Sequence, residues 1–138
     1  MLKLAPCILF VALIAAPAAA QNAIPDLRGT WKGNSETVVL GVGNEHHAGP
    51  QSSEPRMSTV SFTMTIDKQD GRRFSGTFAS ARHSAKLVGI IGRNGSIYLV
   101  DDNGTSEGTM LAPNRMDLCY LMRLPATRLA SCTELTKQ

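Results

Sequence analysis

The sequence is poor in aromatic residues, in cysteine and in charge of a single sign. Aromatic residues make up 5% of its 138 residues, and only three cysteines are present. The formal net charge is +3, and basic residues are scattered among acidic ones rather than forming a long run. A nucleic-acid-binding surface needs Lys and Arg gathered on one face. The charge pattern therefore argues against a nucleic-acid partner.

Long apolar runs are also lacking, except at the N-terminus. Lys3 precedes an apolar stretch over residues 4–16, which ends in Pro17-Ala18-Ala19-Ala20. A basic start, a short apolar core and a small-residue exit are typical of a secretory signal peptide. The run is shorter than the roughly 20 residues that span a bilayer. We predict a cleaved, bacterial-type signal peptide over residues 1–20, no membrane span after cleavage, and a periplasmic or secreted protein.

The remaining segment, residues 21–138, has the length of a single domain and shows no helical periodicity. Apolar and polar residues alternate instead, as in the run from Val60 to Ile66, which is typical of half-buried antiparallel strands. Strands are predicted over residues 59–67, 74–78, 86–92, 96–101, 105–111, 116–122 and 127–135, with one or two more in 27–43. The fold class is therefore all-β, an antiparallel up-and-down meander of eight or nine strands. Closure into a small barrel would remove the sheet edges; a two-sheet sandwich is the alternative.

Turn residues separate these strands. Asn94-Gly95 and Asn103-Gly104 predict two-residue type I′ turns, because both central positions of that turn need a positive φ. Residues 44–57 are polar and contain the only long loop. We expect this loop to border the barrel mouth, since recognition loops lie on rigid scaffolds.

Two cysteines, Cys119 and Cys132, remain after cleavage of the leader. If the last hairpin turns at Pro125-Ala126, paired residues have numbers that sum to 251, and the two cysteines then lie directly opposite one another. Opposed Cβ atoms approach within about 5 Å, which permits a bridge in an oxidising compartment. We predict a structural disulfide; two buried free thiols are the alternative.

Gly29-Thr30-Trp31 opens the first predicted strand, and this motif resembles the Gly-x-Trp motif in the first strand of calycins, the group of lipocalins and avidins. The resemblance implies a small barrel in which Trp31 closes one end. It also implies an arginine from the last strand packed on the indole, a cation–π contact. Arg128 is the candidate, and Arg123 is the fallback. Avidins wall biotin with several tryptophans, whereas this chain has one.

Inward-facing apolar residues could line a ligand cavity or fill a solid core, since eight-stranded barrels are just wide enough to be filled by side chains. The candidate ligand-lining residues are Phe62, Met64, Phe74, Phe78, Leu99 and Tyr120.

No convincing catalytic or metal-binding motif is present. Glu45-His46-His47 and the separate His83 could ligate a metal, but adjacent residues of an extended chain point in opposite directions, so a solvated polar loop is preferred. Ser35, Ser52 and Ser53 have no surrounding nucleophile motif such as Gly-x-Ser-x-Gly. We predict no catalytic residue, no metal, no cofactor and no enzyme activity.

The sequence thus favours an exported, non-enzymatic binding protein that takes a small apolar or amphipathic ligand in or at the barrel mouth. The alternative is an interaction module or inhibitor, of the protease- or lysozyme-inhibitor type, whose loops engage an extracytoplasmic protein.

Overall fold

The computed structural model describes residues 23–138 and contains eight strands and no helix in that range. The predicted leader, residues 1–20, lies outside the described residues. The strands are β1 (Gly29–Gly41), β2 (Arg56–Asp70), β3 (Arg73–Ala79), β4 (Ser84–Ile91), β5 (Ile97–Val100), β6 (Gly104–Ala112), β7 (Arg115–Leu124) and β8 (Thr127–Lys137). Over the described residues, no helix is long and apolar enough to cross a membrane.

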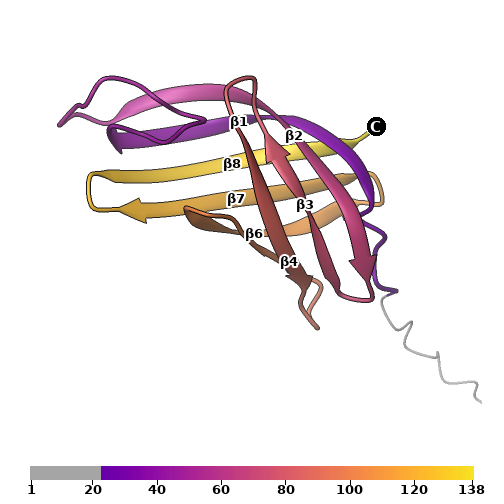
Figure 1. Cartoon of the computed structure of the whole chain (residues 1–138). Coiled ribbons are helices and arrows are strands. Elements are labelled where there is room, and N and C mark those ends of the chain that lie inside the picture. Colours follow the sequence, from indigo (N-terminus) through magenta and orange to yellow (C-terminus); the bar gives the residue numbers. More distant parts are fainter. Residues whose placement is uncertain (1–22) are drawn as a thin grey trace, which may run out of the picture.

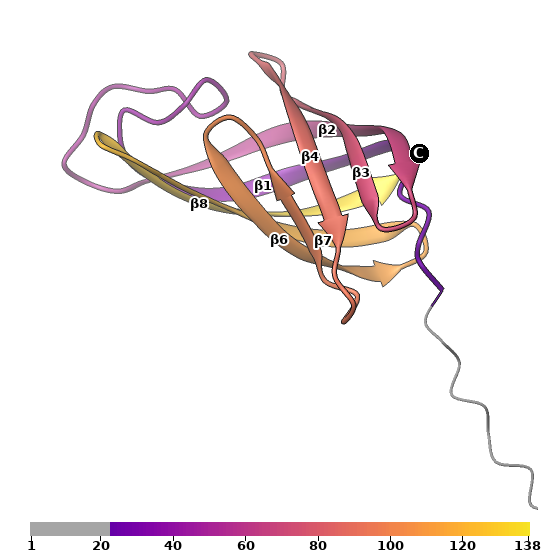
Figure 2. The same ribbon diagram turned by 60° about the horizontal axis from the view of Figure 1, so that its bottom comes forward.

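Each strand pairs antiparallel with the next, and β8 pairs with β1, so the sheet closes into a barrel. This confirms the predicted all-β up-and-down barrel, with eight strands, and excludes the sandwich. The two predicted pieces of residues 27–43 form one continuous strand, β1. The loop between β1 and β2 and the β7–β8 turn lie at the end of the barrel away from the C-terminus (Figures 1 and 2). We call this end the mouth.

Neither predicted type I′ turn forms, because no residue other than glycine has a positive φ in the described part of the chain. Of the four residues in the two Asn-Gly pairs, only Gly95 has a positive φ, of 86°. Its amide donates to the Gly92 carbonyl at 3.0 Å, giving a turn followed by a glycine bulge. At the second turn the Asp101 carboxylate accepts the amides of Asn103 and Gly104, each at 2.9 Å. These two hydrogen bonds stabilise the turn without the positive φ values that a type I′ turn needs at Asn103 and Gly104.

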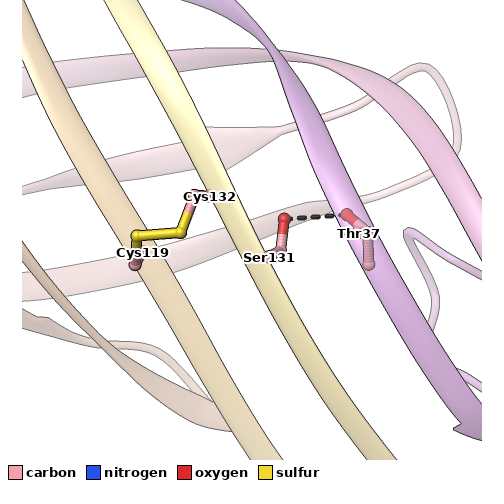
Figure 3. The surroundings of a disulfide bond; sticks show 4 residues. All are labelled: Thr37, Cys119, Ser131 and Cys132. Atoms are coloured by element: carbon pink, nitrogen blue, oxygen red, sulfur yellow. Dashed lines mark hydrogen bonds between the residues drawn. A yellow bond between two sulfur atoms is a disulfide. The ribbon is translucent and has the colours of Figure 1, made fainter.

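The last hairpin turns where the sequence predicted. Leu124 pairs with Thr127 and Cys119 with Cys132, and the two cysteines form a disulfide. The bridge lies on the outer face of β7 and β8, whereas neighbouring residues such as Ser131 point inward (Figure 3). The predicted structural disulfide is confirmed.

The interior is layered along the barrel axis. The end opposite the mouth holds a large apolar cluster that includes Trp31, Met64, Phe74 and Leu99. A smaller cluster of Val39, Met122 and Leu129 lies near the mouth. Buried hydroxyl residues separate the two clusters: Ser35, Thr37, Ser106, Ser131 and Thr133. The Thr37 hydroxyl lies 2.8 Å from that of Ser131 and 3.1 Å from that of Ser35, which satisfies these buried groups (Figure 3).

Trp31 is fully buried, and its indole nitrogen donates to the Leu27 carbonyl at 2.8 Å. The cation beside its ring is Lys137, whose Nζ lies 5.2 Å from the ring centroid. The prediction that Arg128 packs on the Trp31 ring is wrong. Arg128 pairs with Leu40 at the far end of β1, whereas Trp31 pairs with Lys137. Arg123 lies opposite Arg128 and is equally remote.

Candidate functional site

The first part of the β1–β2 loop, residues 43–47, crosses the mouth. It contacts the β3–β4 turn, the β5–β6 turn and the start of β8. Glu45 accepts a hydrogen bond from Asn103 of the β5–β6 turn at 3.3 Å. His46 bonds Ser80 of the β3–β4 turn through Nδ1 at 2.8 Å. The Gly43 carbonyl accepts from Thr127 at the start of β8 at 3.1 Å. We call residues 43–47 the lid.

His46 and His47 are the buried part of the lid, with exposed fractions of 8% and 5%. Both rings lie against Phe62, with centroid separations of 5.1 and 5.7 Å. The loop bends here, because the Asn44 side-chain oxygen accepts the amides of both histidines. The prediction of a solvated polar loop is therefore wrong for these two residues. Sequence alternation assumes an extended chain, and the Asn44 turn removes that assumption.

Burial disfavours the charged imidazolium at both positions. It lowers the pKa of His46, an effect increased by His83 and opposed by Asp101 and Glu45. It lowers the pKa of His47 to about 4, with smaller contributions from His46 and Arg56. Neutral histidines are therefore part of the closed lid at neutral pH.

Arg56, the first residue of β2, holds the lid from the other side. Its Nη2 donates to the His47 carbonyl at 3.1 Å and to the Val42 carbonyl at 3.3 Å. Gly49 lies so close that an added Cβ would come within 2.6 Å of the guanidinium carbon. Glycine at position 49 thus makes room for Arg56.

Below the lid, the Tyr120 hydroxyl donates to Asp101 at 3.2 Å. Burial, the largest cause, and the neighbouring Asp101 raise the pKa of Tyr120 well above its usual range. The phenol is therefore neutral and acts as a donor. Asp101 accepts this hydrogen bond in addition to the two turn amides, so it ties the β5–β6 turn to β7.

A groove of about 610 Å³ lies at the mouth end, over the ends of β6, β7, β8 and β1. Its floor is mostly apolar and is formed by outward-facing side chains of these strands. Its lining residues are Val38, Leu40, Pro55, Gly104, Thr105, Leu121, Met122, Arg123, Arg128, Leu129 and Ala130.

The floor belongs to a row of directly paired residues on the outside of the barrel, which we call the apolar row. It crosses seven strands in the order Met57, Val38, Ala130, Leu121, Thr105, Val100 and Val88. Six of the seven are apolar, and Leu121 is 61% exposed. Because Ala130 is small and lies between Val38 and Leu121, the surface is hollowed at that point.

Two further rows flank the apolar row. Toward the mouth, Arg123 pairs with Arg128, which pairs with Leu40. We call Arg123 and Arg128 the arginine pair. On the other side runs the disulfide, with Glu107 beside Cys119 and Glu36 beside Cys132. The groove thus has the arginine pair on its mouth side. On the opposite side, Glu107 and Glu36 lie one at each end of the disulfide.

The predicted ligand-lining residues do not line this groove. Met64, Phe74 and Leu99 lie inside the large cluster, and Phe78 packs against it. The Phe74 ring occupies the space above Gly89, where an added Cβ would be 2.2 Å from Cζ. Phe62 lies between Phe78 and the lid. Tyr120 packs against the smaller cluster near the mouth. The structure brings these six together as interior residues in two groups, and their ligand-lining role stays a prediction.

His46 and His83 do come close, with ring centroids 5.0 Å apart. Within residues 23–138, however, no three His, Cys, Asp or Glu side chains are placed to hold a metal ion together.

Sequence reasoning placed the long loop at the mouth, but it missed the groove, the arginine pair and the closed arrangement of the lid. One signal was available for the groove. Val38, Val39 and Leu40 are consecutive, so apolar side chains occupy both faces of β1 at that point. A strand that is apolar only toward the core would alternate.

Comparisons with known proteins identify no family. No family model matches the chain, and no curated protein matches it either. Among solved structures, the S-type phycobiliprotein lyase CPES from Guillardia theta is similar over 81% of this chain and 88% of its own. The identity is 12% and the TM-score 0.38. The closed eight-stranded barrel itself agrees with the architecture that the calycin resemblance implies.

The prediction that this chain is not an enzyme is contradicted by that comparison, because the similar structure is of a protein named a lyase. We therefore withdraw the non-enzymatic prediction.

Proposed function

We propose that this chain is an exported protein, periplasmic or secreted, that binds a small apolar or amphipathic ligand at the mouth of its barrel. The groove of about 610 Å³ is the observation that carries the proposal. Its volume is within the usual range of small-molecule sites, which are concave and mostly apolar with a few polar groups. An exposed apolar surface of this kind is usually an interaction site.

The ligand binds in the groove, on the outer face of the barrel at the mouth end, rather than inside the barrel. The lid residues His46 and His47 close the mouth against Phe62, and the far half of the interior is occupied by the large apolar cluster. The groove, by contrast, is open to solvent without any movement of the lid.

Native mass spectrometry tests this proposal on the mature protein, purified from its own periplasm or culture fluid. We expect a small molecule to remain bound. An Ala130→Trp variant, which fills the groove floor, should lose it. Thr77→Trp, on the outer face of β3, is the matched control and should keep it. As a direct probe, 1-decanol should bind the wild type and the control but not Ala130→Trp. No adduct and no decanol binding would contradict the proposal.

A second candidate is a protein-interaction module acting through its loops, and one observation favours it. Residues 48–54, which follow the lid, are exposed except for Ser52. Figure 2 shows this loop beside the β7–β8 turn, and Gly49, Pro50 and Glu54 within it are exposed. In the same mass spectra, a second protein attached to the wild type but not to a variant with residues 49–53 replaced by Gly and Ser would support this candidate.

A further inference from the structure

The arginine pair is an unusual feature of the groove. Arg123 and Arg128 are direct cross-strand partners on β7 and β8, and both are exposed. Like charges placed directly opposite one another destabilise a sheet. Neither arginine belongs to an ion pair within residues 23–138, where the pairs are Arg28–Asp26, Arg73–Asp70 and Arg115–Glu134. An anion bound between the two guanidinium groups would relieve their repulsion.

The charges around the groove also favour one orientation of a charged ligand. The arginine pair lies on the mouth side of Leu121 and Ala130, whereas Glu107 and Glu36 flank the disulfide on the opposite side. An anionic group would be attracted toward the first side and repelled from the second. The strip between them is apolar, so it suits a hydrocarbon chain rather than a second charge.

Strand addition by a peptide does not suit this face. The barrel is closed, and β6, β7, β8 and β1 each already pair with two neighbours. Peptides that add to a sheet need an unpaired edge. Recognition at the groove therefore relies on side chains, which fits a compact ligand with one apolar and one charged part.

We propose that the groove binds a single-chain amphiphile with an anionic head, held by Arg123 and Arg128, with its alkyl chain along Val38, Ala130 and Leu121. The guanidinium fork matches a carboxylate or similar head bidentately. This inference rests on the proposed function, since it specifies the ligand class of the same groove. The site is on the outer face of the barrel and leaves the interior unused.

Isothermal titration of the mature protein with decanoate and with 1-decanol tests the inference. The two probes have the same chain length and differ in head-group charge, so their difference isolates the arginine pair. At low salt we expect decanoate to bind roughly tenfold more tightly, because a hydrogen bond to a charged group contributes enough for about one decade of affinity. The Arg123→Gln/Arg128→Gln variant should lose this preference while binding decanol as before. Lys68→Gln/Arg93→Gln, which removes two exposed positive charges at the other end of the barrel, is the charge-matched control.

The outcomes separate the two proposals. Equal affinities for decanoate and decanol would overturn the anionic class and leave the groove proposal standing. Binding of neither probe would overturn both. Binding only to phosphatidylglycerol vesicles, with none to monomeric decanoate, would assign the arginine pair to a lipid surface instead and overturn the inference.

The double variant should unfold at no lower temperature than the wild type, since it loses a like-charge contact, and thermal unfolding checks this. If the double variant does not fold, Arg128→Gln alone replaces it in the titration.

Discussion

Trp31 is the residue on which the closed end of the barrel depends. It is fully buried and its indole nitrogen is hydrogen-bonded to Leu27. Trp31→Ala removes a large buried side chain and should lower the free energy of unfolding by about 3–5 kcal/mol. Urea unfolding followed by circular dichroism measures the loss, because the variant has no tryptophan to report it.

Tyr98→Ala is the control for that prediction, since Tyr98 is an aromatic residue on a strand with its side chain on the outer face. Its effect should be far smaller than that of Trp31→Ala. A loss at position 31 below about 0.5 kcal/mol, the size expected of an ordinary surface site, would contradict the placement of Trp31 in the barrel floor.

The hydroxyls of Thr37 and Ser131 form a second residue-scale feature that can be tested. They are buried partners on β1 and β8, 2.8 Å apart (Figure 3). Thr37→Val should cost about 1–3 kcal/mol, because it leaves Ser131 without this partner. Adding Ser131→Ala should recover part of the loss. A double-mutant cycle by urea unfolding checks this, and strictly additive losses would show that the two hydroxyls are not coupled.

At this scale, local geometry could be predicted and long-range register could not. The Cys119–Cys132 pair followed from one hairpin turn, so the arithmetic of a local register was enough. The cation beside Trp31 depended on how β8 meets β1, over a separation of about a hundred residues. The sequence contains no turn that sets this register, and Lys137 occupies the position assigned to Arg128.

The lid is the element whose behaviour should change with pH. Both lid histidines have lowered pKa values, and that of His47 is about 4. An open lid exposes imidazoles with a pKa near 6.5, so the open state binds more protons than the closed one. Closure is therefore fully favoured above about pH 6.5 and weakens as the pH falls toward 4.

Amide hydrogen exchange measures this effect. After correction for intrinsic rates, residues 43–47 should lose protection between about pH 6.5 and pH 4, whereas the amides of β3 should not. A His47→Phe variant keeps a ring against Phe62 but removes the proton site, so its lid should respond less to acid. Protection of the wild-type lid that stays constant over this range would contradict the prediction.

Elements also differ in how far the sequence anticipates them. The prediction of 127–135 for β8 falls two residues short of its observed end, whereas β2 was located correctly but extends three residues beyond the predicted 59–67 at each end. The closed lid was not predicted, because its histidines are buried by contacts with Phe62, Ser80 and Ser58, which come from two other elements. Both Asn-Gly turns were located correctly but adopt other conformations, since the Asp101 cap and the Gly95 bulge compete with the type I′ turn.

At the scale of the whole molecule, the closed barrel was predictable because eight alternating strands joined by tight turns leave few ways to hide their edges. The groove was not, because it depends on which outward residues are brought into line by the shear of the closed sheet. Met57 and Val88 are 31 positions apart in the chain yet share one row across seven strands. Such a row exists only once every register is set.

At the scale of the whole molecule, we also predict that export and the disulfide occur together. Disulfides persist in oxidising compartments, so a Cys119–Cys132 bridge and a cleaved leader should occur together. Intact mass of the protein from its own cell envelope or medium should place the N-terminus at Gln21. Thiol titration after denaturation without reductant should find no free thiol.

The same chain produced without residues 1–20 in a reducing cytoplasm is the control. It should fold, since the barrel core does not involve the bridge, but it should carry two thiols. It should be less stable by at most roughly 3 kcal/mol, the loop-entropy contribution of a short closed loop. Oxidation should restore that stability. Retained Met1 in a membrane fraction would contradict export, and two titratable thiols in the exported protein would contradict the bridge, so either half of the prediction can fail alone.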